Sequence, residues 1–198
     1  KFCREMKPKV VVMNGDLFIL SAISRWPRIG WEARPTVKQE LAAVIERLTE
    51  MEQASPGSAR VWPLGNHDAR YELRLAQVGP EYEGVAGFTL KDHFPLWQPC
   101  WSIWINNDVV IKHRFKSGIH AAYNSTVYAG KTIIHGHLHS LKVYPFTDYN
   151  GTRYGIDAGT MADVYGEQTV DYTEDNPVNW RSGFAVLTYH EGKLLWPE

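Results

Sequence analysis

Three histidines stand within five positions, 135–139, at the end of the apolar run in the segment IIHGHLH. Imidazole nitrogens bind metal ions and carry protons, so His137 and His139 are candidates for either role. Gly136 allows the sharp turn that two ligand side chains need in order to converge. A histidine at a strand end can also bond backbone or water, and the segment alone leaves both interpretations open.

Polar residues follow three other apolar runs in the same way. Asp16 follows VVVMNG, Asn66 and His67 follow VWPLG, and His113 follows DVVIK. In open α/β sheets ligands bind outside the carboxyl ends of strands, so we expect these side chains to meet at one place. Carboxylate, amide and imidazole donors without a thiolate suit manganese, iron, cobalt, nickel or zinc. The pattern therefore predicts a metal site.

Hydrophobic periodicity indicates the elements that would position these residues. Residues 10–16 predict a buried strand that ends in a turn, and residues 36–53 predict an amphipathic helix capped by Thr36. Its apolar face would consist of Val37, Leu41, Val44, Ile45 and Leu48. Residues 101–115 predict two strands about a turn, residues 117–130 a helix closed by Gly130, and the part after Val143 short antiparallel strands. The order is typical of an α/β sandwich.

Composition limits the class of protein. A chain of 198 residues with 44% hydrophobic content fits one domain, residues 1–198. The net charge of −1 does not draw the whole molecule to nucleic acid or to a membrane, so a nucleic-acid partner is left open but not implied. Cys3 and Cys100 form no CxxC pair, and no apolar run reaches membrane-spanning length. We expect a cytoplasmic protein without a membrane partner; the sequence does not indicate its oligomeric state.

Four motifs together resemble those of a known family. NGD at 14–16, GNHD at 65–68, the isolated His113 in IKHRF and GHLH at 136–139 are similar, in this order, to the calcineurin-like metallophosphoesterases of the bacterial or phage type. The resemblance covers nearly the whole chain. It implies a four-layer sandwich of two mixed β-sheets flanked by helices. It also implies hydrolysis of a phosphomonoester or phosphodiester by a metal-bound hydroxide at two divalent ions, with manganese favoured over iron, zinc, nickel and cobalt.

The resemblance assigns the metal ligands residue by residue. Asp16 would bridge the two ions, because a carboxylate can give one oxygen to each. The second ion would also take Asn66, His113 and His137, and the first would take His139.

Other residues would act on the substrate. His67 would serve as a cationic stabiliser or as the general acid for the leaving oxygen, with Asp68 orienting its ring. Five basic residues would form either a solvated face or the rim of a phosphate site. They are Arg25, Arg28, Lys112, Arg114 and Lys116. His120 is a further candidate for a substrate contact. We expect His93 and His190 to be structural or surface residues, and His135 to pack or to bond backbone.

The sequence departs from the family pattern in two places. The Asp-x-His pair that opens the family's first strand does not occur, so we expect this domain to be truncated at its N-terminus and impaired in activity. Ile19 stands where many relatives carry an acidic residue. Two alternatives to a general phosphoesterase remain. One is a DNA exonuclease or endonuclease of the same superfamily, and the other is a non-catalytic scaffold domain that kept the fold.

Overall fold

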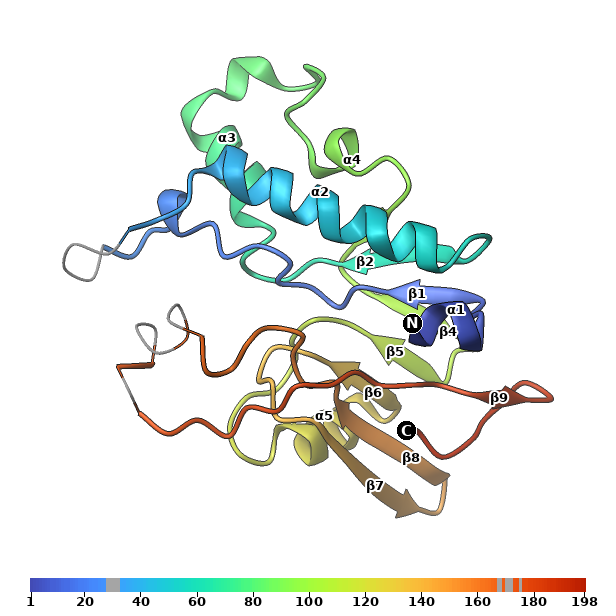
Figure 1. Ribbon diagram of the computed structural model, residues 1–198. Coiled ribbons are helices and arrows are strands. Elements are labelled where there is room, and N and C mark those ends of the chain that lie inside the picture. Colours follow the sequence, from blue (N-terminus) through green and yellow to red (C-terminus); the bar gives the residue numbers. More distant parts are fainter. Residues whose placement is uncertain (28–32, 167–168, 170–172, 175) are drawn as a thin grey trace. The chain divides into compact units, whose positions relative to one another are not determined.

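The computed structural model describes residues 1–27, 33–166, 169, 173–174 and 176–198, and it divides into two compact units, residues 1–101 and 102–198 (Figure 1). Each unit combines β-strands with at least one helix, which confirms the predicted α/β class. The prediction of one domain over residues 1–198 stays a prediction.

The first unit contains one parallel sheet and most of the helices of the described chain. The sheet has the order β1-β2-β3, with β1 parallel to β2 and β2 parallel to β3. In chain order the elements are α1 (Phe2–Met6), β1 (Val10–Val12), η1 (Ser21–Ile23), α2 (Val37–Ala54), β2 (Ala59–Pro63), α3 (Arg70–Val78), η2 (Pro80–Tyr82), α4 (Leu90–His93) and β3 (Gln98–Cys100).

Helix α2 confirms the predicted amphipathic helix. It begins in a capping box, in which the Thr36 side chain accepts from Gln39 N and the Gln39 side chain accepts from Thr36 N. Val44 and Leu48 are buried as expected. The prediction was wrong for Ile45, which is 41% exposed, because a helix advances about 100° per residue and the residue after Val44 leaves the narrow buried stripe.

The core of the first unit reaches the turn that follows β1. Trp62 on β2 packs edge-on against Phe94, with ring centroids 5.3 Å apart, and Phe18 lies 6.0 Å from Trp62. Phe18 and Leu20 are both buried. The segment after Asp16 is therefore held by apolar contacts, which limits the positions that the Asp16 side chain can take.

The second unit is built on a five-stranded mixed sheet of order β4-β5-β6-β8-β7. Strands β5, β6 and β8 are parallel to their neighbours in that series, and β4 and β7 are antiparallel edge strands. The elements are β4 (Ile103–Ile105), β5 (Val109–Ile111), α5 (Ala121–Ala129), β6 (Thr132–His135), β7 (Lys142–Asp148), β8 (Gly151–Asp157), β9 (Tyr189–His190) and β10 (Lys193–Leu194). The predicted strand pair, helix and late antiparallel strands are confirmed.

Two glycines allow α5 to end and to pack against the sheet of this unit. Gly130 ends the helix at φ 63°, in the left-handed region that glycine adopts readily. A Cβ at Gly155 on β8 would overlap the carbonyl group of Ala122, so glycine is what allows α5 to pack closely on the sheet.

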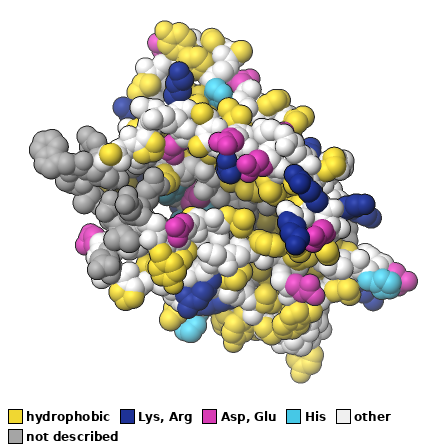
Figure 2. Space-filling model, viewed as in Figure 1, with side chains coloured by type: hydrophobic (Ala, Val, Ile, Leu, Met, Phe, Trp, Pro, Cys, Tyr) yellow, Lys and Arg dark blue, Asp and Glu magenta, His cyan; other side chains and the backbone are white. Residues whose placement is uncertain are grey.

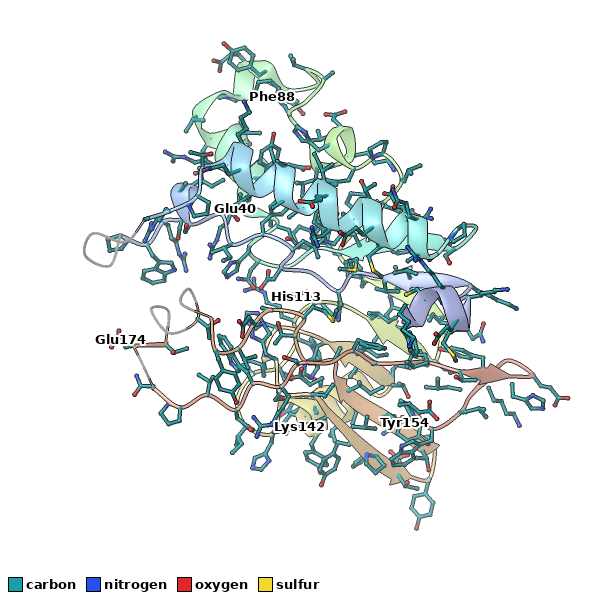
Figure 3. The ribbon with its side chains drawn as sticks, viewed as in Figure 1. Glu40, Phe88, His113, Lys142, Tyr154 and Glu174 are labelled. Atoms are coloured by element: carbon teal, nitrogen blue, oxygen red, sulfur yellow. The ribbon has the colours of Figure 1, made fainter. Side chains whose placement is uncertain are left out.

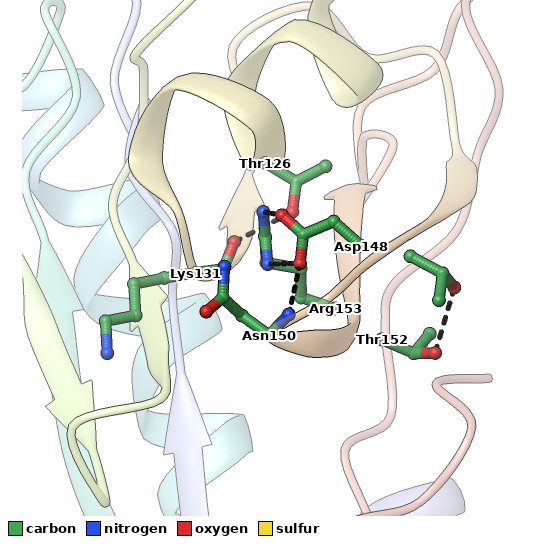
Figure 4. Close-up of polar contacts among 7 residues, drawn as sticks. Thr126, Lys131, Asp148, Asn150, Thr152 and Arg153 are labelled. Carbon is green, nitrogen blue, oxygen red and sulfur yellow. Dashed lines mark hydrogen bonds and ion pairs between the residues drawn. The ribbon is translucent and has the colours of Figure 1, made fainter.

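An ion pair closes the β7–β8 hairpin at the surface (Figure 4). Nη1 and Nη2 of Arg153 donate to the two carboxylate oxygens of Asp148 at 3.0 and 2.6 Å, and the backbone N of Asn150 donates at 2.8 Å. The bonds from Arg153, and then that from Asn150, lower the pKa of Asp148 from its usual 3.8 to about 2.

We expect this pair to make the stability of the second unit depend on pH. The pKa of Asp148 is lower in the folded chain than in the unfolded one, so its contribution is complete above about pH 4 and is lost as the pH falls towards about 2. Asp148→Asn removes the ionisable group. The difference in melting temperature between wild type and variant should therefore shrink over this interval. Thermal melts at neutral pH and through the acid range measure it, and a constant difference would contradict the prediction.

The surface agrees with the near-neutral composition. Basic and acidic side chains are interspersed on the face shown in Figure 2. Among the described residues no helix is both long enough and apolar enough to cross a membrane.

Candidate functional site

Two predicted turns meet at one edge of the first unit. Strands β1 and β2 are parallel neighbours, so the turns after them lie at the same edge. There the backbone N of His67 donates to Oδ1 of Asp16 at 2.9 Å. A Cβ at Gly65 would overlap the Asp16 carboxylate, so the glycine of GNHD is required for this close approach. The sequence prediction that these turns converge is confirmed within this unit.

The hydrogen bonds of Asp68 show a role that the sequence did not indicate. Its carboxylate is fully buried and accepts five hydrogen bonds at 2.8–3.3 Å. The donors are the backbone N of Asp16, Leu17, Phe18 and Gly65 and the indole Nε1 of Trp62. Asp68 thus ties the NGD turn to the GNHD turn, and its role in orienting the His67 ring stays a prediction. The N-cap residue of the following helix, α3, is Ala69.

Burial raises the pKa of Asp68 to about 6, and the negative charge of Asp16 adds to this increase. The hydrogen bonds from Gly65, Trp62 and Asp16 oppose it. A buried carboxylate is retained here because it satisfies several backbone N–H groups at once.

Glu40 fixes the next part of the same loop and was not predicted. Its Oε2 accepts from the backbone N of Ile19 and of Leu20, both at 2.8 Å, and Figure 3 labels it on α2. The signal in the sequence was an acidic residue in the stripe that continues with Val44 and Leu48 at four-residue spacing.

The backbone carbonyl group of Ile19 contacts His67, the candidate catalytic residue. Nδ1 of His67 lies 3.1 Å from the carbonyl oxygen of Ile19, which also accepts from Nη1 of Arg70 at 2.6 Å. A carbonyl oxygen only accepts, so Nδ1 carries a proton in this contact. Nε2 is then the nitrogen through which His67 can exchange a proton with a substrate.

Two observations fit a cation at these turns. Oδ1 of Asn66 is buried and has no hydrogen-bond partner among the described residues, which suits an oxygen that binds a metal ion. Asp16, in the first of these turns, has φ 54°, a conformation that few residues other than glycine adopt. Backbone strain of this kind concentrates at functional sites.

The second unit brings together two predicted ligands. Strands β5 and β6 are parallel neighbours, and the backbone N of Gly136 and of His137 donate to the carbonyl oxygen of His113. Nε2 of His113 lies 3.1 Å from Nδ1 of His137. Two nitrogens that bind one ion at about 2.1 Å and at right angles are about 3.0 Å apart. The pair can share a proton in a hydrogen bond or hold a cation between them. Figure 3 labels His113.

Asp157 anchors the turn that carries His137 and His139. Its carboxylate, 1% exposed, accepts from Oγ of Ser140 at 2.7 Å and from the backbone N of Gly159 at 3.1 Å. The ring of His135, also buried, lies 3.7 Å from this carboxylate. His135 is therefore structural, as predicted, and Asp157 is a positioning residue that no local motif indicated.

Of the remaining histidine and arginine candidates that the structure describes, His139 is half-buried and the others are exposed. The ring of His139 packs edge-on against Trp180, with centroids 4.6 Å apart. Arg25 and Arg114 are exposed, and the Arg25 guanidinium lies 5.0 Å from the ring centroid of Trp26. His120 is exposed at the N-cap position of α5. Arg28 lies outside the described residues.

The candidate ligands thus form two sets. Asp16, Asn66 and the neighbouring His67 belong to the first unit, and His113, His137 and His139 belong to the second. Each set stands at the carboxyl ends of parallel strands in its own sheet.

Comparison with known proteins gives relatives without a stated activity. No protein-family model matches the chain. The chain is 25% identical over 218 residues to "Gene 54 protein" of Mycobacterium phage L5, which covers 98% of the chain and 82% of that protein. It is 24% identical over 225 residues to "Gene 54 protein" of Mycobacterium phage D29, covering 100% of the chain and 83% of that protein. Function must therefore be argued from the site.

Proposed function

We propose that the protein is a metal-dependent phosphoesterase with the metallophosphoesterase sandwich fold. The observation that carries the proposal is the convergence of His113 Nε2 and His137 Nδ1 to 3.1 Å. These nitrogens come from two adjacent strand ends, and a third histidine, His139, stands in the same turn. Structural histidines rarely need this arrangement, whereas a metal site does.

The two sets of donors would act as one centre with two divalent ions. The mixture of carboxylate, amide and imidazole ligands favours manganese, with iron, zinc, nickel or cobalt as alternatives. When bound, the ions would lower the pKa of a water molecule and neutralise charge on the phosphoryl oxygens. Asp16 would bridge them, Asn66, His113 and His137 would complete one shell, and His139 would belong to the other.

The chain's own residues would supply the remaining chemistry. The contact between His67 Nδ1 and Ile19 O fixes the ring so that Nε2 can give a proton to the leaving oxygen of a phosphomonoester or phosphodiester. Asp68 and Glu40 hold the turn that carries Asp16, so this ligand would already be in position before an ion binds.

Metal titration and turnover test this proposal together. We expect wild-type protein to bind Mn²⁺ and to hydrolyse bis(4-nitrophenyl) phosphate or 4-nitrophenyl phosphate. His137→Ala should lower Mn²⁺ affinity about 10-fold or more and lower activity with it, because a ligand is removed. Asp16→Ala should weaken the same ion, although it belongs to the other unit, if the two sets form one centre. Calorimetry and elemental analysis measure the metal.

His190→Ala is the matched control, because this histidine is exposed on β9 and belongs to neither set. Full metal occupancy in His137→Ala would reject the ligand assignment. Mn²⁺ binding that depends on His137 without turnover of either ester would favour the alternative of a non-catalytic scaffold.

A further inference from the structure

A long part of the second unit contains no acidic residue. Between Asp108 and Asp148 the chain carries five basic residues and no Asp or Glu, although the whole chain has a net charge of −1. The five are Lys112, Arg114, Lys116, Lys131 and Lys142. A local excess of positive charge attracts polyanions even when the whole molecule is nearly neutral.

Four of these five cations lie at the edge that carries the histidine ligands. Lys112, Arg114 and Lys116 follow β5, on either side of His113. Lys142 begins β7 and pairs in register with Asp157, the last residue of β8, which in turn pairs with His135 at the end of β6. Four of the five cations of this part of the chain therefore lie near the predicted ligands, and Lys131 lies at the other end of β6.

Exposed aromatic rings accompany the cations. Phe115 is 43% exposed and Tyr128, on α5, is 71% exposed. Nζ of Lys116 lies 3.8 Å from the ring centroid of Tyr128 and 5.2 Å from that of Phe115, and Nζ of Lys112 lies 5.5 Å from the latter. Cation–π contacts of this kind hold rings in place while they remain accessible to solvent.

We propose that Lys112, Arg114, Phe115, Lys116 and Tyr128, here called the 112–128 surface, bind single-stranded nucleic acid as the substrate of the proposed phosphoesterase. Nonspecific binding of single strands combines cations that follow the phosphates with aromatic rings on which bases stack. A duplex hides its base faces, so exposed rings favour the single strand. The inference rests on the proposed function for the chemistry but not for the binding.

The reaction would be hydrolysis of one phosphodiester bond. The oxygen of water bonds to phosphorus, the bond from phosphorus to the leaving sugar oxygen breaks, and that oxygen takes a proton, so no further reactant is needed. The 112–128 surface would hold the strand beside His113, and the residues of the proposed centre would act on the phosphate.

Binding can be measured apart from hydrolysis. With EDTA present, fluorescence anisotropy of labelled oligothymidylate gives the affinity without turnover. We expect Phe115→Ala and Tyr128→Ala each to weaken binding about tenfold. Lys116→Ala should reduce the slope of log affinity against log salt by about 0.7, the value for one phosphate contact on a single strand. Tyr149→Ala and Lys193→Ala, at exposed positions outside the 112–128 surface, are the controls and should bind as wild type does.

Each outcome separates this inference from the proposed function. Hydrolysis of bis(4-nitrophenyl) phosphate by wild type without binding of oligothymidylate would overturn the inference and leave the phosphoesterase standing. Binding that depends on Phe115 and Tyr128 without hydrolysis of any ester would support the surface and reject the activity. Equal affinity for duplex and single strand, unchanged in Phe115→Ala, would mean that charge alone binds and would overturn the stacking.

Discussion

Asp68→Asn is expected to destabilise the first unit by about 3–5 kcal/mol, the cost of breaking a buried charged hydrogen-bond network. The wild-type carboxylate accepts from five N–H groups with two oxygens. The Asn side chain has only one oxygen that can accept hydrogen bonds. An NH₂ group, which is itself a donor, takes the place of the second oxygen and faces backbone N–H donors. Buried N–H groups then lose their acceptor, and the two turns that they hold together separate.

Asp92→Asn provides the matched control. Asp92 also accepts from backbone N–H groups, of Gly87 and Thr89, but at an exposed position where water can replace it. We expect a much smaller loss of stability for this variant. Urea denaturation at neutral pH measures the free energy of unfolding of both variants. An equal loss in the two would show that the stabilising effect of Asp68 does not depend on its burial and its number of donors.

The sequence was sufficient to predict where the functional turns begin. An apolar β-branched run followed by a polar turn marks the carboxyl end of a buried strand, and two such strands in parallel bring their turns together. This logic applied to Asp16 with His67 and to His113 with His137, and in each case the structure gives a contact of about 3 Å within one unit.

The residues that hold those turns could not be read in the same way. Asp68, Glu40 and Asp157 each bind atoms that are distant in sequence, on a neighbouring strand end or loop. Local patterns report periodicity and turn chemistry, whereas these contacts depend on which elements the fold brings together. The prediction linked Asp68 to its neighbour His67, and it missed the bonds that Asp68 accepts from Asp16, Leu17 and Phe18 in the other turn.

The register of the histidine turn illustrates the same limit. The spacing of His137 and His139 alone does not say which ring meets His113, and only the family resemblance placed His137 with it. The parallel pairing of β5 with β6 decides this, because it directs the backbone N of His137 to the carbonyl oxygen of His113. Their rings then lie with centroids 5.1 Å apart.

His67→Ala is expected to lower turnover of the Mn²⁺-loaded protein by about 10²- to 10⁴-fold while leaving metal content unchanged. The reason is that the ring is assigned to the leaving oxygen and not to an ion, with Nδ1 engaged at Ile19 O. His93→Ala is the control within the same unit. Nε2 of His93 contacts Tyr71 and Gly87, which confirms a structural role for this histidine.

The leaving group distinguishes the two roles left open for His67. A general acid matters most when the leaving oxygen is an alkoxide, which must be protonated, and matters little for 4-nitrophenolate, which is stable without a proton. A cationic stabiliser acts on the phosphoryl oxygens and affects both esters alike. We expect the loss in His67→Ala to be much larger for an alkyl ester than for a 4-nitrophenyl ester, because the contact to Ile19 O presents Nε2 as a proton donor when the ring is charged. Equal losses would assign His67 to charge stabilisation, and a loss of metal as large as the loss of turnover would instead place it among the ligands.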